Sequence, residues 1–190
     1  LRCLVGSEMC IRDSGGIMRN SKVFLNGEYI GGWPYGYTSF KLDITDKVIE
    51  NAENVIAIRV ENQDRSSRWY PGSGIYRNVW MNQTHPTHVD HWGTYITTPE
   101  IKKDYAKIVV ETDLVNKQKD SVSIELITSI FNSDGNLVAL TNNKGIEIAS
   151  ESKTQVSSEL IVENHQLWDL ENPHLYTCLL YTSDAADEWL

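Results

Sequence analysis

Residues 105–131 read YAKIVVETDLVNKQKDSVSIELITSIF, and this stretch decides the fold class. Apolar side chains recur at every second position through two runs that are separated by polar residues. The alternating face carries Ile108, Val110, Thr112 and Leu114 in the first run, and Val122, Ile124, Leu126, Thr128 and Ile130 in the second. A period of two predicts strands with one buried face. The stretch therefore indicates consecutive strands of an all-β domain.

Further strands are expected on both sides of this stretch. They span 89–97, 137–140, 146–149 and 155–162, with Asp134-Gly135 as a turn. Short strands at this spacing with polar turns are typical of a β-sandwich, and about 90 residues suffice for one immunoglobulin-like unit. Residues 82–86 read NQTHP and are expected to form the linker in front of this unit, with Pro86 as the break.

A second group of strands is expected before that linker. Two short apolar runs within 23–30 flank Asn26-Gly27, which is a hairpin signal. Residues 39–44 alternate apolar and polar side chains and predict a half-buried strand. Residues 55–60 are nearly all apolar, so we expect a central strand that is covered on both faces. No helix with a convincing period and caps accompanies these strands.

The two ends of the chain lack these strand and turn patterns. Neither shows an amphipathic period, a cap or a turn signal that leads into the neighbouring pattern. Codons for Cys178–Ser183 can be written whose reverse complement, in another frame, encodes Met9–Asp13. Two unrelated protein ends would rarely encode opposite strands of one DNA sequence. We therefore expect residues 1–14 and 178–190 to be translated sequencing adapter; the alternative is two native termini.

Composition limits the ligand classes. The 190 residues carry 17 basic and 26 acidic side chains, a formal net charge of −9, and the balance stays negative within 15–177. Nucleic-acid binders need a basic face, so nucleic acid is not expected as a partner, whereas a neutral ligand fits. No apolar run is long enough to cross a membrane. The three cysteines, Cys3, Cys10 and Cys178, lie in the suspect ends, so they predict no disulfide framework and leave the compartment open.

The candidate binding segment is 68–77, which reads RWYPGSGIYR. Pro71 fixes its own φ and the glycines that follow it adopt angles that other residues avoid, so the middle of the segment is a turn. Such a turn can hold Arg68 and Trp69 together above a sheet edge. Aromatic rings cover the C–H faces of a sugar, and a guanidinium donates to its hydroxyls. The alternative is that the aromatic residues are buried packing groups.

No residues are assigned to catalysis, to a metal or to a cofactor. Hydrolysis of a glycosidic bond needs two convergent carboxylates, and the acidic residues here lie at strand ends and loops, where solvated side chains are the rule. His88 and His91 are three residues apart on an expected strand, which directs them to opposite faces and argues against one shared metal. No glycine-rich phosphate cradle follows a strand.

A second local signature is WDLENPHLY at 168–176. We expect it to be a closing strand with a proline-containing turn. Pro173 would fix the turn, while Trp168, Leu175 and Tyr176 pack.

Six motifs along the chain share one likeness. They are VFLNGEYIG at 23–31, GYTSFKLDIT at 36–45, NVIAIRVEN at 54–62, RWYPGSGIYR at 68–77, WGTYITTP at 92–99 and WDLENPHLY at 168–176. In this order they resemble glycoside hydrolase family 2, and most closely its β-galactosidases. The resemblance implies the later half of a sugar-binding jelly-roll domain over 15–85. It also implies an immunoglobulin-like β-sandwich over 86–177.

The resemblance also implies which chemistry lies elsewhere. In the family, a (β/α) barrel carries both catalytic glutamates, one of them within an Asn-Glu dipeptide, and residues 15–177 contain no Asn-Glu. The segment alone is therefore expected to be inactive. In related β-galactosidases a jelly-roll loop reaches the barrel's active site, and the matching position here is Arg68, beside Trp69. Some relatives have an acidic residue there. Arg77 is expected to tie its strand to a neighbouring acid.

Two functions of different class follow. The first is a fragment of a retaining exo-glycosidase that removes terminal β-galactosyl residues. Its partners would be a β-galactoside and the catalytic barrel of the same chain, with a homo-oligomer also possible. A β-glucuronidase or β-mannosidase parent would differ only in the sugar. The second function is a non-catalytic carbohydrate-binding or adhesion protein made of two sandwiches.

Overall fold

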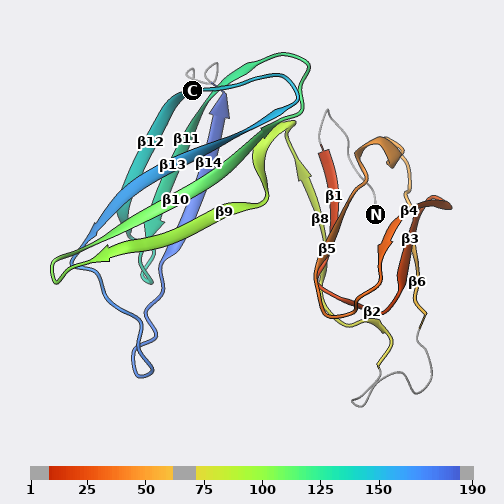
Figure 1. Ribbon diagram of the computed structural model, residues 1–190, viewed down its shortest axis with the longest axis horizontal. Coiled ribbons are helices and arrows are strands. Elements are labelled where there is room, and N and C mark those ends of the chain that lie inside the picture. Colours follow the sequence, from red (N-terminus) through yellow and green to blue (C-terminus); the bar gives the residue numbers. More distant parts are fainter. Residues whose placement is uncertain (1–8, 62–71, 185–190) are drawn as a thin grey trace. The chain divides into compact units, whose positions relative to one another are not determined.

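The computed structural model describes residues 9–61 and 72–184 and divides the chain into two units, Leu1–His85 and Pro86–Leu190 (Figure 1). Within the described residues every regular element is a strand, apart from one 3-10 turn at Thr45–Lys47. All strand pairs are antiparallel. The all-β fold class expected from the alternating runs is therefore confirmed.

The described residues of unit 1 form eight strands in three small sheets. The strands are β1 (Met9–Ser14), β2 (Ile17–Met18), β3 (Ser21–Leu25), β4 (Glu28–Trp33), β5 (Phe40–Asp43), β6 (Ile56–Arg59), β7 (Gly74–Ile75) and β8 (Val79–Thr84). The sheets have the strand orders β5-β1-β8, β4-β3-β6 and β2-β7. Buried Leu25 of β3 and Ile44, which follows β5, pack together with Met81 of β8, so the first two sheets share one core. This packing makes unit 1 a sandwich.

The hairpin expected at Asn26-Gly27 is present. Both residues have positive φ, 51° at Asn26 and 86° at Gly27, as a tight two-residue turn between twisted strands requires. The Asn26 side chain accepts from the Val55 amide at 2.9 Å and donates to buried Asn54 at 2.9 Å. These bonds attach the turn to the segment that leads into β6.

The strand expected at 55–60 is not a central one. β6 pairs only with β3 among the described strands, and it lies at the edge of its sheet. Val55 is 56% exposed, and burial alternates along β6 because only one face packs on the core. The expectation of a doubly covered strand was wrong, since apolar composition alone does not distinguish an edge strand from a central one.

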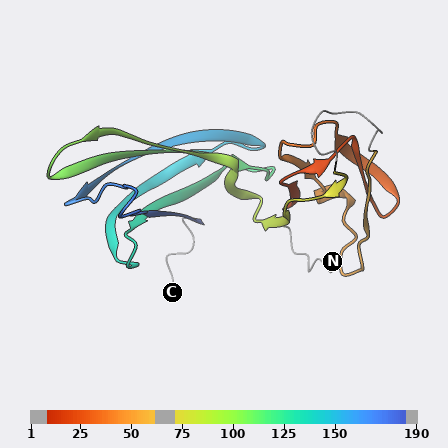
Figure 2. The same ribbon diagram turned by 90° about the horizontal axis from the view of Figure 1, so that it is seen from below.

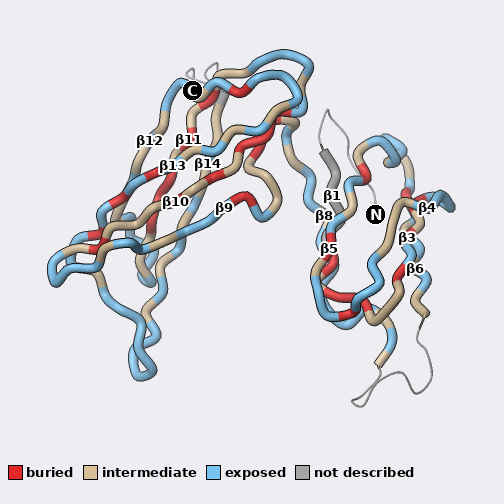
Figure 3. Tube along the Cα trace, viewed as in Figure 1, coloured by how far each residue is buried: buried red, intermediate tan, exposed pale blue. Residues whose placement is uncertain are grey.

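Between Pro86 and Asp184, the described part of unit 2 forms six strands in two sheets. The strands are β9 (Thr87–Ile101), β10 (Tyr105–Asn116), β11 (Val122–Phe131), β12 (Leu137–Ile148), β13 (Ser152–Glu163) and β14 (Thr177–Asp184). The sheets have the orders β13-β10-β9 and β12-β11-β14. Figure 2 shows them as two layers, and Figure 3 shows buried residues along β10 and β11. The two alternating runs within 105–131 thus form the central strand of each sheet, β10 and β11.

Several boundaries in unit 2 differ from the sequence expectation. β12 is one strand rather than two, with Gly145 at φ 64° and an irregular register near its end. The expected linker at 82–86 shrinks to two residues, because β8 continues to Thr84 and β9 begins at Thr87. Pairing with β1 extends β8 in this way, and the sequence of β8 alone does not reveal that partner.

The signature at 168–176 is a loop in the structure, not a strand. Trp168 is 55% exposed and Leu175 is 68% exposed, so the expectation that they pack was wrong. Tyr176 does pack against the core, and its hydroxyl accepts from the Gln166 amide at 2.9 Å. An Asx turn shapes the loop, since the Asp169 carboxylate accepts from the Glu171 and Asn172 amides.

Both suspect ends take part in sheets. β1 pairs with β5 and β8 in unit 1, and β14 pairs with β11 in unit 2. A strand ladder is formed by backbone groups that every non-proline residue carries. The pairing therefore does not bear on the DNA origin of residues 1–14 and 178–190, and the adapter hypothesis stays a prediction.

The core of unit 2 consists of two apolar clusters with a polar layer between them. One cluster is centred on Val110, Ile130, Leu160 and Val162, and the other on Leu114, Ile124, Leu126 and Ile148. Thr112, Thr128 and Ser158 occupy the alternating positions between the clusters and are almost completely buried. Thr128 Oγ1 donates to Ser158 Oγ across the sandwich at 3.3 Å, and Ser158 Oγ donates to Asn143 Oδ1 at 2.8 Å.

Asn116, at the end of β10, closes one end of this sandwich. It is fully buried, and its Nδ2 donates to the carbonyls of Asp120, Ile148 and Ala149 at 2.8–3.2 Å. Its Oδ1 accepts from the Gln118 amide at 2.9 Å and from Thr87 Oγ1 at 3.5 Å. One side chain thus joins β9, the turn after β10 and the end of β12.

Replacement of Asn116 by alanine is expected to destabilise unit 2 by at least about 3 kcal/mol, because several buried backbone groups lose their partner at once. Urea unfolding followed by the NMR signals of β10 measures this change. Asn142→Ala on the exposed face of β12 is the matched control and should stay within about 0.5 kcal/mol. Equal losses in the two variants would contradict the role given to Asn116.

The Thr112 hydroxyl is buried and has no hydrogen-bond partner among the described residues. Thr112→Val keeps the shape and removes this polar group, so we expect unit 2 to be stabilised by about 1 kcal/mol. Thr128→Val removes a hydroxyl that is bonded to Ser158 and should be neutral or destabilising. Calorimetric melting of both variants distinguishes the two cases, and a destabilised Thr112→Val would refute the prediction.

Candidate functional site

The binding segment predicted from sequence is described only in its second part. Arg68 and Trp69 lie outside the described residues, so their predicted contact with a sugar stays a prediction. Gly74 and Ile75 form β7, which pairs with β2 through Met18 opposite Gly74 and Ile17 opposite Ile75. Gly74 has φ 113°, a conformation that side chains with a Cβ rarely adopt. This short ladder fixes where the segment rejoins the domain.

Tyr76 anchors the end of the segment. Its hydroxyl donates to the Gly36 carbonyl at 2.9 Å, which links it to the loop between β4 and β5. Its ring packs on the Gly16 backbone so closely that a Cβ at residue 16 would lie 2.9 Å from the hydroxyl oxygen. The sequence predicts no role for Tyr76, because a single aromatic residue after a turn carries no distinguishing pattern.

Arg77 is a scaffold residue, but not in the way expected. Its guanidinium lies 5.3 Å from the centre of the Tyr76 ring, and its Nη1 donates to the Gly15 carbonyl at 3.4 Å. The expected acidic partner is not found among the described residues. The cation and the ring support each other in a way typical of arginine beside an aromatic face.

The loop between β4 and β5 lies beside Tyr76, whose hydroxyl donates to the Gly36 carbonyl in this loop. It reads WPYGYT from Trp33 to Thr38. The Trp33 ring stacks on Phe40, with ring centres 6.3 Å apart and planes 12° apart, and its Nε1 donates to Thr38 Oγ1 at 2.7 Å. Part of this loop belongs to the motif at 36–45, but its place on the surface was not predicted from the sequence. Aromatic residues at three alternate positions around a Pro-x-Gly turn were the available signal.

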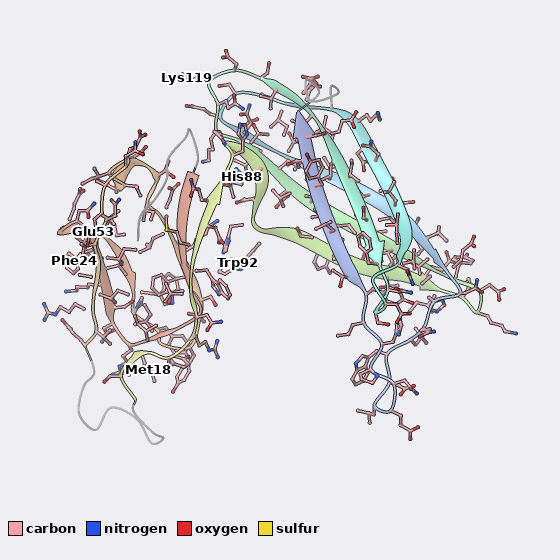
Figure 4. All side chains as sticks on the ribbon, turned by 180° about the vertical axis from the view of Figure 1, so that it is seen from behind. Met18, Phe24, Glu53, His88, Trp92 and Lys119 are labelled. Carbon is pink, nitrogen blue, oxygen red and sulfur yellow. The ribbon has the colours of Figure 1, made fainter. Side chains whose placement is uncertain are left out.

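The glycine in the middle of that loop permits a close approach. A Cβ at Gly36 would lie 2.2 Å from the Met18 sulfur and 3.2 Å from the Met18 Cα, so a larger residue there would require Met18 in β2 to shift. Met18 is labelled in Figure 4, at the end of unit 1 that carries β7. Tyr35 and Tyr37 flank Gly36 with ring centres 5.6 Å apart at 67°, and they are 57% and 39% exposed.

The described carboxylates do not indicate an acid–base site. The Asn142 amide and the Lys144 ammonium donate to Glu125 and lower the pKa of its carboxyl, whereas a general acid needs a raised pKa. Hydrogen bonds from the Lys153 ammonium to Asp113 and Asp90 raise the lysine pKa and bridge β13, β10 and β9. These pairs are surface links between strands.

The described histidines do not form a cluster that suits a metal ion. His88 is buried, and Figure 4 labels it together with Trp92. The centres of the His91 and Trp92 rings lie 4.5 Å apart, and the backbone of Trp92 has φ 57°. Within residues 9–61 and 72–184, no three His, Cys, Asp or Glu side chains gather in a way that suits a metal ion. In the same part of the chain, no helix has the length and apolar character needed to span a membrane.

Known proteins match the chain over both units. The family model described as "Glycosyl hydrolases family 2" matches residues 87–190. The chain is 40% identical over 163 residues to the β-galactosidase BoGH2A of Bacteroides ovatus, covering 85% of this chain and 19% of that protein. It is 32% identical over 176 residues to a β-glucuronidase of Formosa agariphila, covering 81% of this chain and 18% of that protein.

A solved structure agrees with the fold. A family 2 glycosyl hydrolase from Bacteroides cellulosilyticus superimposes with a TM-score of 0.90 and 36% identity, over 94% of this chain and 24% of that one. The chain spans about a fifth of the length of the curated relatives it matches.

Tyr76→Phe is expected to loosen the β2–β7 ladder, because the Gly36 carbonyl loses its donor at a cost of about 1 kcal/mol. Native-state hydrogen exchange reports this change directly, and the amides of that ladder should exchange about five-fold faster. Tyr29→Phe is the control, since Tyr29 is an exposed residue of the β3–β4 hairpin, which does not take part in this ladder. Unchanged exchange in Tyr76→Phe would show that the hydroxyl does not hold the two loops together.

Proposed function

The chain belongs to glycosyl hydrolase family 2, and we propose that it is a non-catalytic, N-terminal part of a retaining exo-glycosidase that hydrolyses terminal β-galactosides. In this proposal unit 1 supplies a sugar-contacting loop and unit 2 supplies scaffold. A catalytic barrel elsewhere in the longer protein supplies the chemistry. The relatives, about five times longer than the matched region, leave ample length for such a barrel.

One observation carries the choice of sugar. Identity to the β-galactosidase BoGH2A is 40%, compared with 32% and 35% to two Formosa proteins named β-glucuronidase and putative β-glucuronidase. An alignment over 163 of the 190 residues extends well into unit 1, whose loops would meet the substrate. A higher identity in that part supports a substrate shared with the β-galactosidase.

The division of labour follows from the chemistry of a retaining glycosidase. The reaction needs a carboxylate nucleophile and a carboxylic acid about 5–5.5 Å apart, one of them with a raised pKa. Hydrogen bonds from the Asn142 amide and the Lys144 ammonium lower the pKa of the Glu125 carboxyl on the surface of unit 2, which is the opposite direction from that of a general acid. In this proposal the described residues hold a loop in place, and the proton transfer belongs to the barrel.

Within unit 1, the proposed sugar contacts are Arg68 and Trp69. The described residues that follow support the position of this segment, because β7 pairs with β2 and Tyr76 bonds to Gly36. A fixed exit from the segment reduces the conformational entropy that substrate binding must remove. An arginine would donate to sugar hydroxyls as a planar fork.

A β-glucuronide is the second candidate substrate. The named relatives include β-glucuronidases, and an arginine at position 68 could pair with a uronate carboxylate in two-point contact. The negative charge balance within 15–177 disfavours an acidic sugar over a neutral one by long-range repulsion. We therefore place the galactoside first.

The test is hydrolysis by the longer protein cloned from the same gene. With matched nitrophenyl substrates we expect kcat/KM for the β-galactoside to exceed that for the β-glucuronide at least ten-fold, a difference of about 1.4 kcal/mol in transition-state binding. The reverse preference would assign the glucuronide, and no hydrolysis of any β-glycoside would refute the enzyme. The 190-residue chain is the control and should hydrolyse neither substrate.

A further inference from the structure

The turn between β3 and β4 contains the one Asn-Gly pair in the 190 residues, Asn26-Gly27. Both residues are exposed, and a Cβ built on Gly27 would have no atom within 4 Å other than those of its chain neighbours. The Gly27 amide donates no hydrogen bond to any backbone group in the described part of the chain. A base in the solvent can therefore reach this nitrogen and remove its proton.

An Asn-Gly pair can deamidate without an enzyme. The deprotonated glycine nitrogen attacks the side-chain Cγ of the asparagine, so an N–C bond forms and closes a five-membered imide. The Cγ–Nδ2 bond breaks, and the nitrogen leaves as ammonia with a proton from the solvent. Water then opens the imide at one of its two carbonyls and gives aspartate or isoaspartate. Glycine favours ring closure because it has no Cβ to crowd the ring and restricts the backbone least.

Hydrogen bonds oppose this reaction while unit 1 is folded. The Asn26 Nδ2 donates to Asn54 Oδ1 at 2.9 Å, and the Asn26 Oδ1 accepts from the Val55 amide at 2.9 Å. Figure 4 labels Phe24 and Glu53, which lie just before these two segments, on the same side of unit 1. Ring closure moves Cγ toward the next residue and expels Nδ2, so both side-chain bonds must break. The folded turn should therefore react more slowly than the unfolded chain.

The product does not fit the place that the asparagine occupies. In aspartate, an acceptor oxygen replaces the Nδ2 donor opposite Asn54 Oδ1. Asn54 is 5% exposed and cannot reverse its amide, because its Nδ2 donates to the Ile49 and Ala52 carbonyls and its Oδ1 accepts from the Ile49 amide. Two acceptors would therefore face each other without a donor. Isoaspartate adds a main-chain carbon to the two-residue connection between the paired residues Leu25 and Glu28, which disturbs that pairing.

We propose that Asn26 is a site of spontaneous deamidation, and that the modified turn detaches from the segment in front of β6. Water is the co-reactant, ammonia is released, and aspartate and isoaspartate at position 26 are the products. β6 is an edge strand whose partner among the described strands is β3, so loss of the turn's bonds leaves it with fewer attachments. The reaction needs neither a sugar nor another domain, so this inference goes beyond the proposed function and does not depend on it.

The first test is ageing of the purified 190-residue chain in mildly alkaline buffer, followed by proteolysis and mass spectrometry of the peptide that contains Asn26. We expect aspartate and isoaspartate to accumulate at this position. In concentrated urea the conversion should be at least about five-fold faster, which corresponds to about 1 kcal/mol for the lost side-chain bonds. No conversion in the folded chain, or equal rates in the folded and unfolded chains, would overturn the proposal.

The second test uses Asn26→Asp, which imitates one product. We expect the amides of β6 to exchange with solvent about ten-fold faster, which corresponds to about 1.4 kcal/mol, while the amides of β10 in unit 2 keep their rates. Asn51→Asp is the matched control, because it makes the same amide-to-carboxylate change at an exposed asparagine with positive φ, 55°. This variant should leave exchange in β6 unchanged. Equal acceleration in the two variants, or none in Asn26→Asp, would refute the detachment.

Discussion

The structure of unit 2 depends on the hydrogen bonds of one buried amide, that of Asn116. A buried backbone group without a partner costs about 1–3 kcal/mol, and three carbonyls and one amide meet at this side chain. A purely apolar residue would fill the space and leave those groups unpaired. Asn54 makes the same kind of closure in unit 1, where it bonds to the backbone of Ile49 and Ala52. Each sandwich is therefore closed at one point by a side chain that replaces missing backbone partners.

Local signals predicted the elements whose partners are near in sequence. The Asn26-Gly27 hairpin and the alternating strands β10 and β11 follow from backbone sterics and a period of two, and all are present. The edge position of β6 and the extension of β8 depend on strands far away in the chain. The exposure of Trp168 likewise depends on what packs beside it. Sequence patterns show that a face is apolar but not what covers it.

The candidate surface was predicted in part. The turn in RWYPGSGIYR is predicted from its proline and glycines, and Pro71 lies outside the described residues, so the turn stays a prediction; Gly74, the first residue of β7, has φ 113°. The neighbouring loop was missed, since its importance rests on contacts between distant segments, Gly36 with Met18 and with Tyr76. A close approach of two backbone segments and a hydrogen bond between residues far apart in the sequence do not change the local pattern of apolar and polar residues.

The hydroxyl layer in the core of unit 2 has a consequence for strand registration. In an alternating strand, a slip by two residues keeps every apolar side chain facing inward, so hydrophobicity alone does not reject it. Such a slip would move Thr128 and Ser158 apart and press their hydroxyls against the apolar clusters, at the cost of unpaired buried groups. The hydroxyl layer therefore specifies the register of the strands. The native register of the strands has a lower free energy than registers shifted by two residues, because only the native register pairs these hydroxyls. The layer therefore selects the native register even where it adds little to stability.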